Sequence, residues 1–120
     1  MAEHNELGVL GEEIAVDYLK RQGYKILTRN YRHKKEEVDI IAQHNKTLIV
    51  IEVKARNSDY HQSPQEAVTK KKQASIIKVA NAYIEENEID LETRFDVIAI
   101  LITEKEINVE HFEDAFYPLL

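Results

Sequence analysis

The 120 residues, 43% of them apolar, are enough for one compact domain with a single core. The chain has no cysteine, which excludes disulfides, thiolate zinc sites and cysteine nucleophiles. No apolar run approaches the roughly 20 residues of a membrane span, and the N-terminus lacks the basic and apolar regions of a signal peptide. We therefore expect a soluble, cytoplasmic protein without a membrane partner, with residues 1–120 forming a single domain.

The formal net charge of −6 is unusual for a nucleic-acid-binding protein, because phosphate contacts need Lys and Arg. The average conceals an asymmetry along the chain. From Lys20 to Lys78 there are 14 Lys and Arg against 6 Asp and Glu, whereas the remainder holds 2 against 16. This basic block favours a partner of opposite charge such as nucleic acid, and a solvated basic face explains the charge equally well.

The first half of the chain predicts one helix and three strands. Residues 5–22 carry apolar side chains at helical spacing, and Gly23 follows where a helix C-terminus favours a residue without Cβ. Residues 24–31, 37–43 and 47–55 are short, β-branched and apolar, which is typical of strands. Their short connections predict an antiparallel meander.

The second half predicts a helix followed by one or two strands. The helix begins either at the capping box of residues 63–66 or a turn later, near Thr69. Residues 94–102 are apolar on both faces, which indicates a central strand reached through a crossover connection. A short strand or turn is expected at residues 107–112, and residues 115–117 are expected to close over the core. The order αβββαβ(β) predicts an α/β fold.

Three charged residues lie on the second and third strands of the meander. Glu52 and Lys54 are two residues apart, so their side chains project from the same face about 6–7 Å from each other. If Asn45-Lys46 is a two-residue turn, Asp39 lies directly across from Glu52. Like charges opposed on paired strands are destabilising, and a divalent cation would relieve both the repulsion and the cost of burial.

Two carboxylates around a hard cation, with a lysine nearby, are suited to phosphodiester hydrolysis. Mg²⁺ bound by one or two carboxylates polarises a phosphoryl oxygen and lowers the pKa of an attacking water. The lysine can orient that water or neutralise charge in the transition state. The structural alternative is that Asp39 ends a strand and that Glu52 and Lys54 form an ion pair. The joint spacing of all three favours the functional interpretation.

The sequence resembles the YraN-like family of predicted bacterial endonucleases over nearly its whole length. Asp39, followed by twelve residues and Glu52-Val53-Lys54, is similar to the PD-(D/E)xK signature of restriction-endonuclease-like and Holliday-junction-resolvase-like enzymes. Other stretches that carry the resemblance are Gly8-x-x-Gly11-Glu12-x-x-Ala15-x-x-Tyr18-Leu19, Gly23-Tyr24, Arg29-Asn30-Tyr31-Arg32, Glu37-Val38-Asp39-Ile40-Ile41-Ala42, Val50 to Arg56, Ala67-Val68-x-x-x-Lys72-Gln73 and Arg94-Phe95-Asp96-Val97. The resemblance implies a three-layer fold in which helices flank a mixed central sheet of four to five strands.

The resemblance also implies roles for individual residues. Asp39 and Glu52 would bind Mg²⁺ or Mn²⁺, Lys54 would assist the water, and Glu12 would complete the acidic cluster as a third ligand. From the residues alone, Glu12 belongs to an acidic pair on a helix, which is usually a solvated face. Glu37 shares a strand face with Asp39 and is either a carboxylate supporting the metal ligands or a surface residue. Family members usually have Gly before this Glu, whereas this chain has Glu36.

The basic block supplies side chains that we expect to contact nucleic-acid phosphates. They are Arg29, Arg32, Lys34, Lys35, Arg56, Lys70, Lys71, Lys72 and Gln73. Lys72 lies on the apolar stripe of the second helix, so contact with phosphate, pairing with the acidic cluster and extension past the core edge are all open. Arg94 and Asp96 favour a structural pair.

The function expected from the sequence is a metal-dependent endonuclease that hydrolyses DNA, including branched or otherwise structured DNA. Junction-cutting enzymes of this fold commonly act as dimers, so the resemblance also implies a homodimer. The alternative is a non-catalytic nucleic-acid-binding or protein-interaction module that retains the fold. No zinc spacing among the histidines, Gly-rich phosphate loop or serine-hydrolase elbow is present in the sequence.

Overall fold

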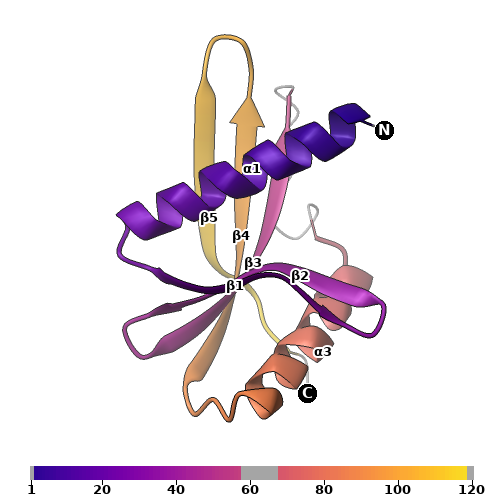
Figure 1. Ribbon diagram of the computed structural model, residues 1–120, viewed down its shortest axis with the longest axis vertical. Coiled ribbons are helices and arrows are strands. Elements are labelled where there is room, and N and C mark those ends of the chain that lie inside the picture. The colour runs from indigo at the N-terminus through magenta and orange to yellow at the C-terminus, as the bar shows by residue number, and fades with distance from the viewer. Residues whose placement is uncertain (1, 58–67, 119–120) are drawn as a thin grey trace.

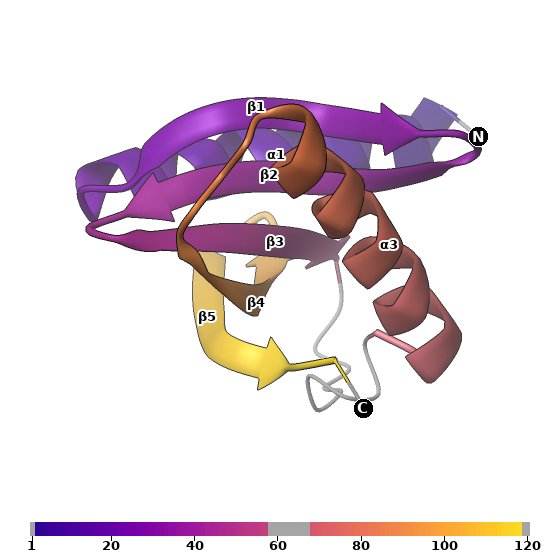
Figure 2. The same ribbon diagram turned by 90° about the horizontal axis from the view of Figure 1, so that it is seen from below.

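The computed structural model describes residues 2–57 and 68–118, leaving out the side chains of residues 2–5. It contains a five-stranded mixed sheet with helix α1 (Ala2–Arg21) on one face and helix α3 (Lys70–Glu86) on the other (Figures 1 and 2). The strands, side by side in this order, are β1 (Lys25–His33), β2 (Glu36–His44), β3 (Thr47–Arg56), β4 (Glu92–Ile102) and β5 (Ile107–Phe116). The order αβββαββ and the mixed sheet confirm the predicted fold class and are compatible with a restriction-endonuclease-like fold.

Gly23 ends the first helix as the sequence predicts. Its φ of 89° lies in the left-handed region, which glycine adopts without strain. The Gly23 amide donates to the Lys20 carbonyl at 3.0 Å, and the Tyr24 amide donates to the Leu19 carbonyl at 2.9 Å. These two bonds satisfy carbonyls at the helix end and turn the chain directly into β1.

The β2–β3 hairpin has the register that its two-residue turn predicts. Asn45 has a φ of 56°, and the antiparallel pairs run from His44–Thr47 to Ile40–Ile51. Asp39 is the next residue of β2 beyond the last pair, and Glu52 is the next residue of β3. The regular ladder between these strands therefore stops where the two carboxylates begin.

The alternation of β2 is interrupted at Asp39. Val38 packs in the core cluster shared with α3, whereas Ile40, two residues later, packs in the cluster shared with α1. In an uninterrupted strand these residues would face the same side. Across the β1–β2 ladder, Asn30 adopts a φ of 53°, and neither Asn30 nor Asp39 takes part in the paired register. The local irregularity turns the Asp39 side chain toward β3.

The second half of the chain completes the sheet through a parallel connection. Thr69 is the N-cap of α3 and its side chain accepts a hydrogen bond from the Lys72 amide, which confirms the later of the two predicted helix starts. The alternative start at residues 63–66 lies outside the described residues. β4 pairs in parallel with β3 and antiparallel with β5, which confirms its central position.

The last strand is longer than the sequence predicts. β5 continues to Phe116 because the edge of β4 offers main-chain partners as far as Phe95. Phe116 is buried and stacks on Phe95 with ring centroids 5.3 Å apart. Ala115 also packs against this core, but Tyr117 is 65% exposed and does not cover it.

Each face of the sheet has its own core. Ala15, Val16 and Leu19 of α1 pack on one face, and Ile76, Val79 and Ala80 of α3 pack on the other. Across the described residues, neither helix combines the length and apolarity that a bilayer span requires.

Candidate functional site

Asp39 is fixed to the neighbouring strand by its own side chain. Its Oδ2 accepts a hydrogen bond of 2.8 Å from the backbone amide of Val53. This bond takes the place of a main-chain pair at the point where the β2–β3 ladder has ended. The carboxylate therefore lies between the two strands, half-buried, with its position determined by the sheet.

Glu52 is a buried acid in an unfavourable environment. Its exposed fraction is 5%, and among the described residues its Oε1 has no hydrogen-bond partner. Burial, and then the charge of Asp39 and a hydrogen bond with that side chain, raise the pKa of Glu52 from 4.5 to about 8. The structure thus places the two predicted carboxylates in direct contact.

Two lysines lower the cost of this pair in part. Lys72 of α3 places its Nζ 3.7 Å from Glu52 Oε2, and its charge, followed by that of Lys54, lowers the pKa of Glu52. Of the three roles open to Lys72, the structure shows pairing with the acidic residues. Lys54 is exposed and projects from the same strand face as Glu52.

A hollow of about 430 Å³ opens beside Asp39, on the side of α1. Its lining residues are Gly8, Val9, Glu12, Arg29, Asn30, Glu37, Asp39 and Val53. Glu12 accepts hydrogen bonds of 3.1 Å from Arg29 Nε and 3.0 Å from Asn30 Nδ2. Glu37 pairs with Arg32 at 3.7 Å. Glu12 thus shares a hollow with Asp39 but is neutralised by β1, while Glu52 faces α3.

The residues proposed for phosphate contact differ in how free they are. Arg29 also contacts Glu13 at 2.7 Å, so it is engaged by two acids of α1. Gln73 donates a hydrogen bond to the Val68 carbonyl, and Arg56 is half-buried. Exposed and turned to solvent are Lys34, Lys35, Lys70 and Lys71.

The carboxylate pair fits a hard divalent cation. Such ions take oxygen ligands, and Mg²⁺ is typically held by one or two carboxylates together with waters and phosphate oxygens. A cation between the two carboxylates would offset both the burial of the unpartnered Glu52 Oε1 and its contact with Asp39. Within residues 2–57 and 68–118, no group of three His, Cys, Asp or Glu side chains is placed to hold a metal. A cation at this position would therefore have two carboxylate ligands from the described chain, Asp39 and Glu52.

A second buried acid, Asp96, has more partners than the Arg94 pairing that the sequence predicts. Asp96 accepts hydrogen bonds from Arg94 at 2.9 Å and from the Asp114 amide at 3.0 Å, and its Oδ2 lies 2.7 Å from His111 Nε2. Burial raises the pKa of Asp96, but the bonds with His111, Arg94 and Asp114 outweigh it and hold the pKa below its usual range. His111 Nδ1 in turn lies 3.0 Å from the Tyr18 hydroxyl.

The fold and this site define an α/β protein with a mixed sheet and a carboxylate pair at the open end of its central hairpin. Residues 11–100 match the model of the family described as "Uncharacterised protein family UPF0102". The chain belongs to this family, which is the YraN-like family that its motifs resemble. The matched range contains Glu12, Asp39, Glu52 and Lys54.

Several bacterial relatives align over almost their entire length. The UPF0102 protein of Flavobacterium psychrophilum is 48% identical over 117 residues, which cover 98% of each chain. That of Christiangramia forsetii is 50% identical over 117 residues, again 98% of each chain. That of Chlorobium phaeobacteroides is 50% identical over 117 residues, 92% of each chain.

Proposed function

We propose that this protein is a metal-dependent endonuclease that hydrolyses phosphodiester bonds of DNA. The observation that carries the proposal is the contact between Asp39 and Glu52, in which burial and like charge raise the pKa of Glu52 to about 8. A fold gains nothing from such a pair unless a cation or proton offsets its charge. The ion pair of Glu52 Oε2 with Lys72, 3.7 Å away, leaves Oε1 without a partner in the described region, so a structural ion pair alone does not satisfy this carboxylate.

The residues of the chain divide the work among them. Asp39 and Glu52 hold Mg²⁺ or Mn²⁺, and Val53 keeps Asp39 in place through its amide. When bound, the ion supplies an electrophile for the phosphoryl oxygen and lowers the pKa of an attacking water. Lys54, exposed on the same strand face as Glu52, contacts the phosphate or the water, where its charge stabilises the transition state.

The test is cleavage of labelled linear, flap and four-way-junction DNA with Mg²⁺ or Mn²⁺. Asp39→Asn retains an acceptor for the Val53 amide, and Glu52→Gln retains the side-chain volume, so both variants should fold. We expect each to lower the cleavage rate by about 10²-fold or more, because removing a metal ligand costs several kcal/mol of transition-state stabilisation. Glu110→Gln, on the exposed side of β5, is the matched control and should cut as the parent does. Equal cleavage by all four proteins would refute the assignment.

A second function is favoured by one observation. Glu12 is occupied by Arg29 and Asn30, and no third carboxylate joins the pair in the part of the chain that the structure describes. A non-catalytic nucleic-acid-binding or protein-interaction module would be consistent with this arrangement. Binding of the same DNA substrates without cleavage in either metal would support this second function and remove the first.

A further inference from the structure

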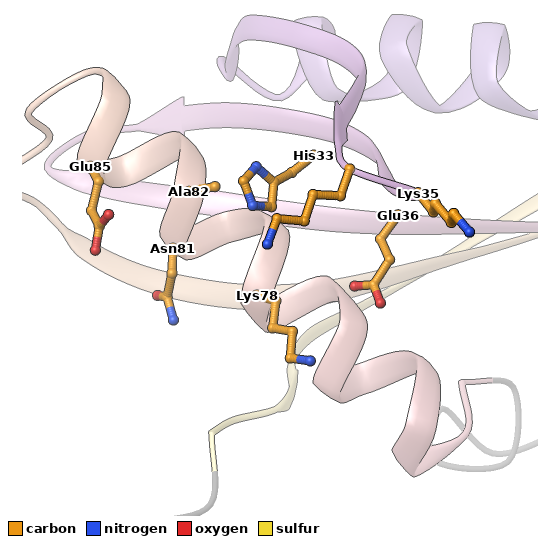
Figure 3. Close-up of a pocket in the computed structure, with 8 residues that line it drawn as sticks. His33, Lys35, Glu36, Lys78, Asn81, Ala82 and Glu85 are labelled. Carbon is orange, nitrogen blue, oxygen red and sulfur yellow. The ribbon is translucent and has the colours of Figure 1, made fainter.

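A groove runs between α3 and the turn that joins β1 to β2. Its hollow has a volume of about 580 Å³ and is lined by His33, Lys34, Lys35, Glu36, Lys78, Asn81, Ala82 and Glu85. Figure 3 shows Glu36, the first residue of β2, directed toward α3, with Lys35 extending along the rim of the hollow and Lys78 on the exposed side of the helix. Lys34, which lies in the turn, adopts a left-handed φ of 58°.

A second hollow continues this groove toward the carboxylate pair. Its volume is about 420 Å³, and it shares Glu36 and Lys78 with the first. Its other lining residues are Thr69, Lys71, Lys72, Ala74 and Ser75. Lys72 then leads directly to the site, because its Nζ lies 3.7 Å from Glu52 Oε2. The two hollows together form one path along α3 that reaches Lys72, the ion-pair partner of Glu52.

The path is lined mainly by lysines, and most of them do not form ion pairs within the described residues. Five lysines line it, Lys34, Lys35, Lys71, Lys72 and Lys78, against two acids, Glu36 and Glu85. Among the described residues, Lys72 alone of the five forms an ion pair. The arginines outside this path are treated differently, since Arg21, Arg29, Arg32 and Arg94 are all paired with carboxylates. In a chain with a net charge of −6, the groove is a cationic track.

We propose that this groove binds the phosphate backbone of one single-stranded DNA arm that leads to the carboxylate pair. The proposal rests on the proposed function, because it places a strand of the substrate at Glu52. Hollows of about 580 and 420 Å³ lie in the size range of small-ligand sites, which suits a single sugar–phosphate backbone. Lysine ammonium groups are point charges suited to contacting successive phosphates without base specificity.

The length of the path agrees with this occupant. From Lys71 to Glu85 a helix rises about 20 Å, which corresponds to about six nucleotides at a stacked rise of about 3.4 Å. Single-strand grooves in other proteins typically hold 4 to 16 nucleotides. The substrate class implied is DNA that carries a single-stranded arm next to the cleaved bond, such as a flap or a frayed end.

The experiment measures binding separately from cleavage. Fluorescence anisotropy with a labelled 12-nucleotide single strand in EDTA reports affinity when no metal is available. Lys35→Ala/Lys78→Ala removes one cation from each wall of the groove. The matched control, Lys46→Ala/Lys105→Ala, removes two exposed lysines from the β2–β3 and β4–β5 turns, away from the groove.

We expect the groove variant to weaken the Kd at least about tenfold and to lower the slope of log K against log salt by about 1.4, the value for two lost phosphate contacts on a single strand. The control should change the Kd less than about twofold. Equal losses in both variants would overturn the proposal. Loss of duplex binding equal to loss of single-strand binding would overturn the assignment to a single strand.

The outcomes separate this inference from the proposed function. If the protein cuts DNA but the groove and control variants bind the strand equally well, the proposed nuclease function stands and the proposed strand-binding groove is refuted. If the protein binds the strand through Lys35 and Lys78 but cuts no substrate, the proposed groove stands and the proposed nuclease function is refuted.

Discussion

Two buried carboxylates lie in the same sheet, and they differ in how their oxygen atoms are satisfied. Among the described residues, Glu52 and Asp96 are the two charged side chains that the fold buries, at 5% and 0% exposure. Asp96 is bonded to Arg94, His111 and the Asp114 amide, which hold its pKa low. Glu52 has one lysine at 3.7 Å and a neighbouring acid, and its pKa is raised to about 8. Burial alone therefore does not mark a site, whereas burial without sufficient partners does.

The largest expected effect is the loss of stability when Asp96, the acid with several hydrogen-bond partners, is replaced. Asp96→Ala leaves Arg94 and His111 facing a buried cavity, so we expect the free energy of unfolding to fall by about 3–5 kcal/mol. Urea denaturation at neutral pH measures this loss. Glu113→Ala removes the exposed acid 3.4 Å from Arg94 and should cost less than about 1 kcal/mol. If the two variants lose the same stability, the bonds of Asp96 do not stabilise the fold as we expect.

A divalent cation should stabilise the protein through Glu52, the other buried acid. At a Mn²⁺ concentration 100 times its Kd, binding to the folded protein raises the free energy of unfolding by about 2.7 kcal/mol. Glu52→Gln should abolish this gain, while Glu110→Gln should keep it. Thermal or urea unfolding with and without Mn²⁺ provides the measurement, and an identical gain in the Glu52 variant would place the ion elsewhere.

The two acids should also respond to pH in opposite directions. The folded pKa of Glu52, about 8, is above its ordinary 4.5, so the stability it contributes is complete below about pH 4.5 and lost as pH rises through about 8. The pKa of Asp96 is lowered, so its contribution is present above about 3.8 and lost as pH falls through the folded pKa. Between about pH 6 and 9, without metal, Glu52→Gln should lose roughly 2–3 kcal/mol less stability than the parent. Parallel pH profiles would contradict this difference.

The smallest expected effect concerns the packing of α1 beside the site. A Cβ added at Gly11 would lie 2.5 Å from the Ala55 Cβ, so Gly11→Ala must move α1 away from β3. The strain of about 1–3 kcal/mol exceeds the helix propensity gained, leaving a net loss of about 1 kcal/mol. Gly8→Ala has nothing within 4 Å of its Cβ and should stabilise the protein slightly, which makes it the matched control for chemical denaturation.

Local rules predicted the parts of the fold that depend on neighbours in sequence. The Asn45-Lys46 turn determined the hairpin register, and strand alternation placed Glu52 and Lys54 on one face. Gly23 marked the end of α1 because its left-handed conformation is a backbone requirement. These local rules are sufficient to predict that Asp39 and Glu52 lie close together.

Contacts between distant segments were not predictable in the same way. The pairing of Glu12 with Arg29, and of Asp96 with His111 fifteen residues later, depends on how α1 and β5 pack on the sheet. The interruption of β2 at Asp39 has no signal in its own strand. The only available hint was Asn30, a residue type that tolerates the left-handed region, on the opposite strand.

The hydrogen bond from the Val53 amide to Asp39 ties the spacing of the two carboxylates to the geometry of the sheet. One oxygen of this side chain is committed to the architecture, so the other is presented at a distance from Glu52 that follows from the interstrand spacing. Changes in loops or in the outer helices can therefore alter what reaches the site without changing the spacing of the two carboxylates. In the proposed nuclease, this arrangement would let substrate choice vary while the two carboxylates keep their relative position.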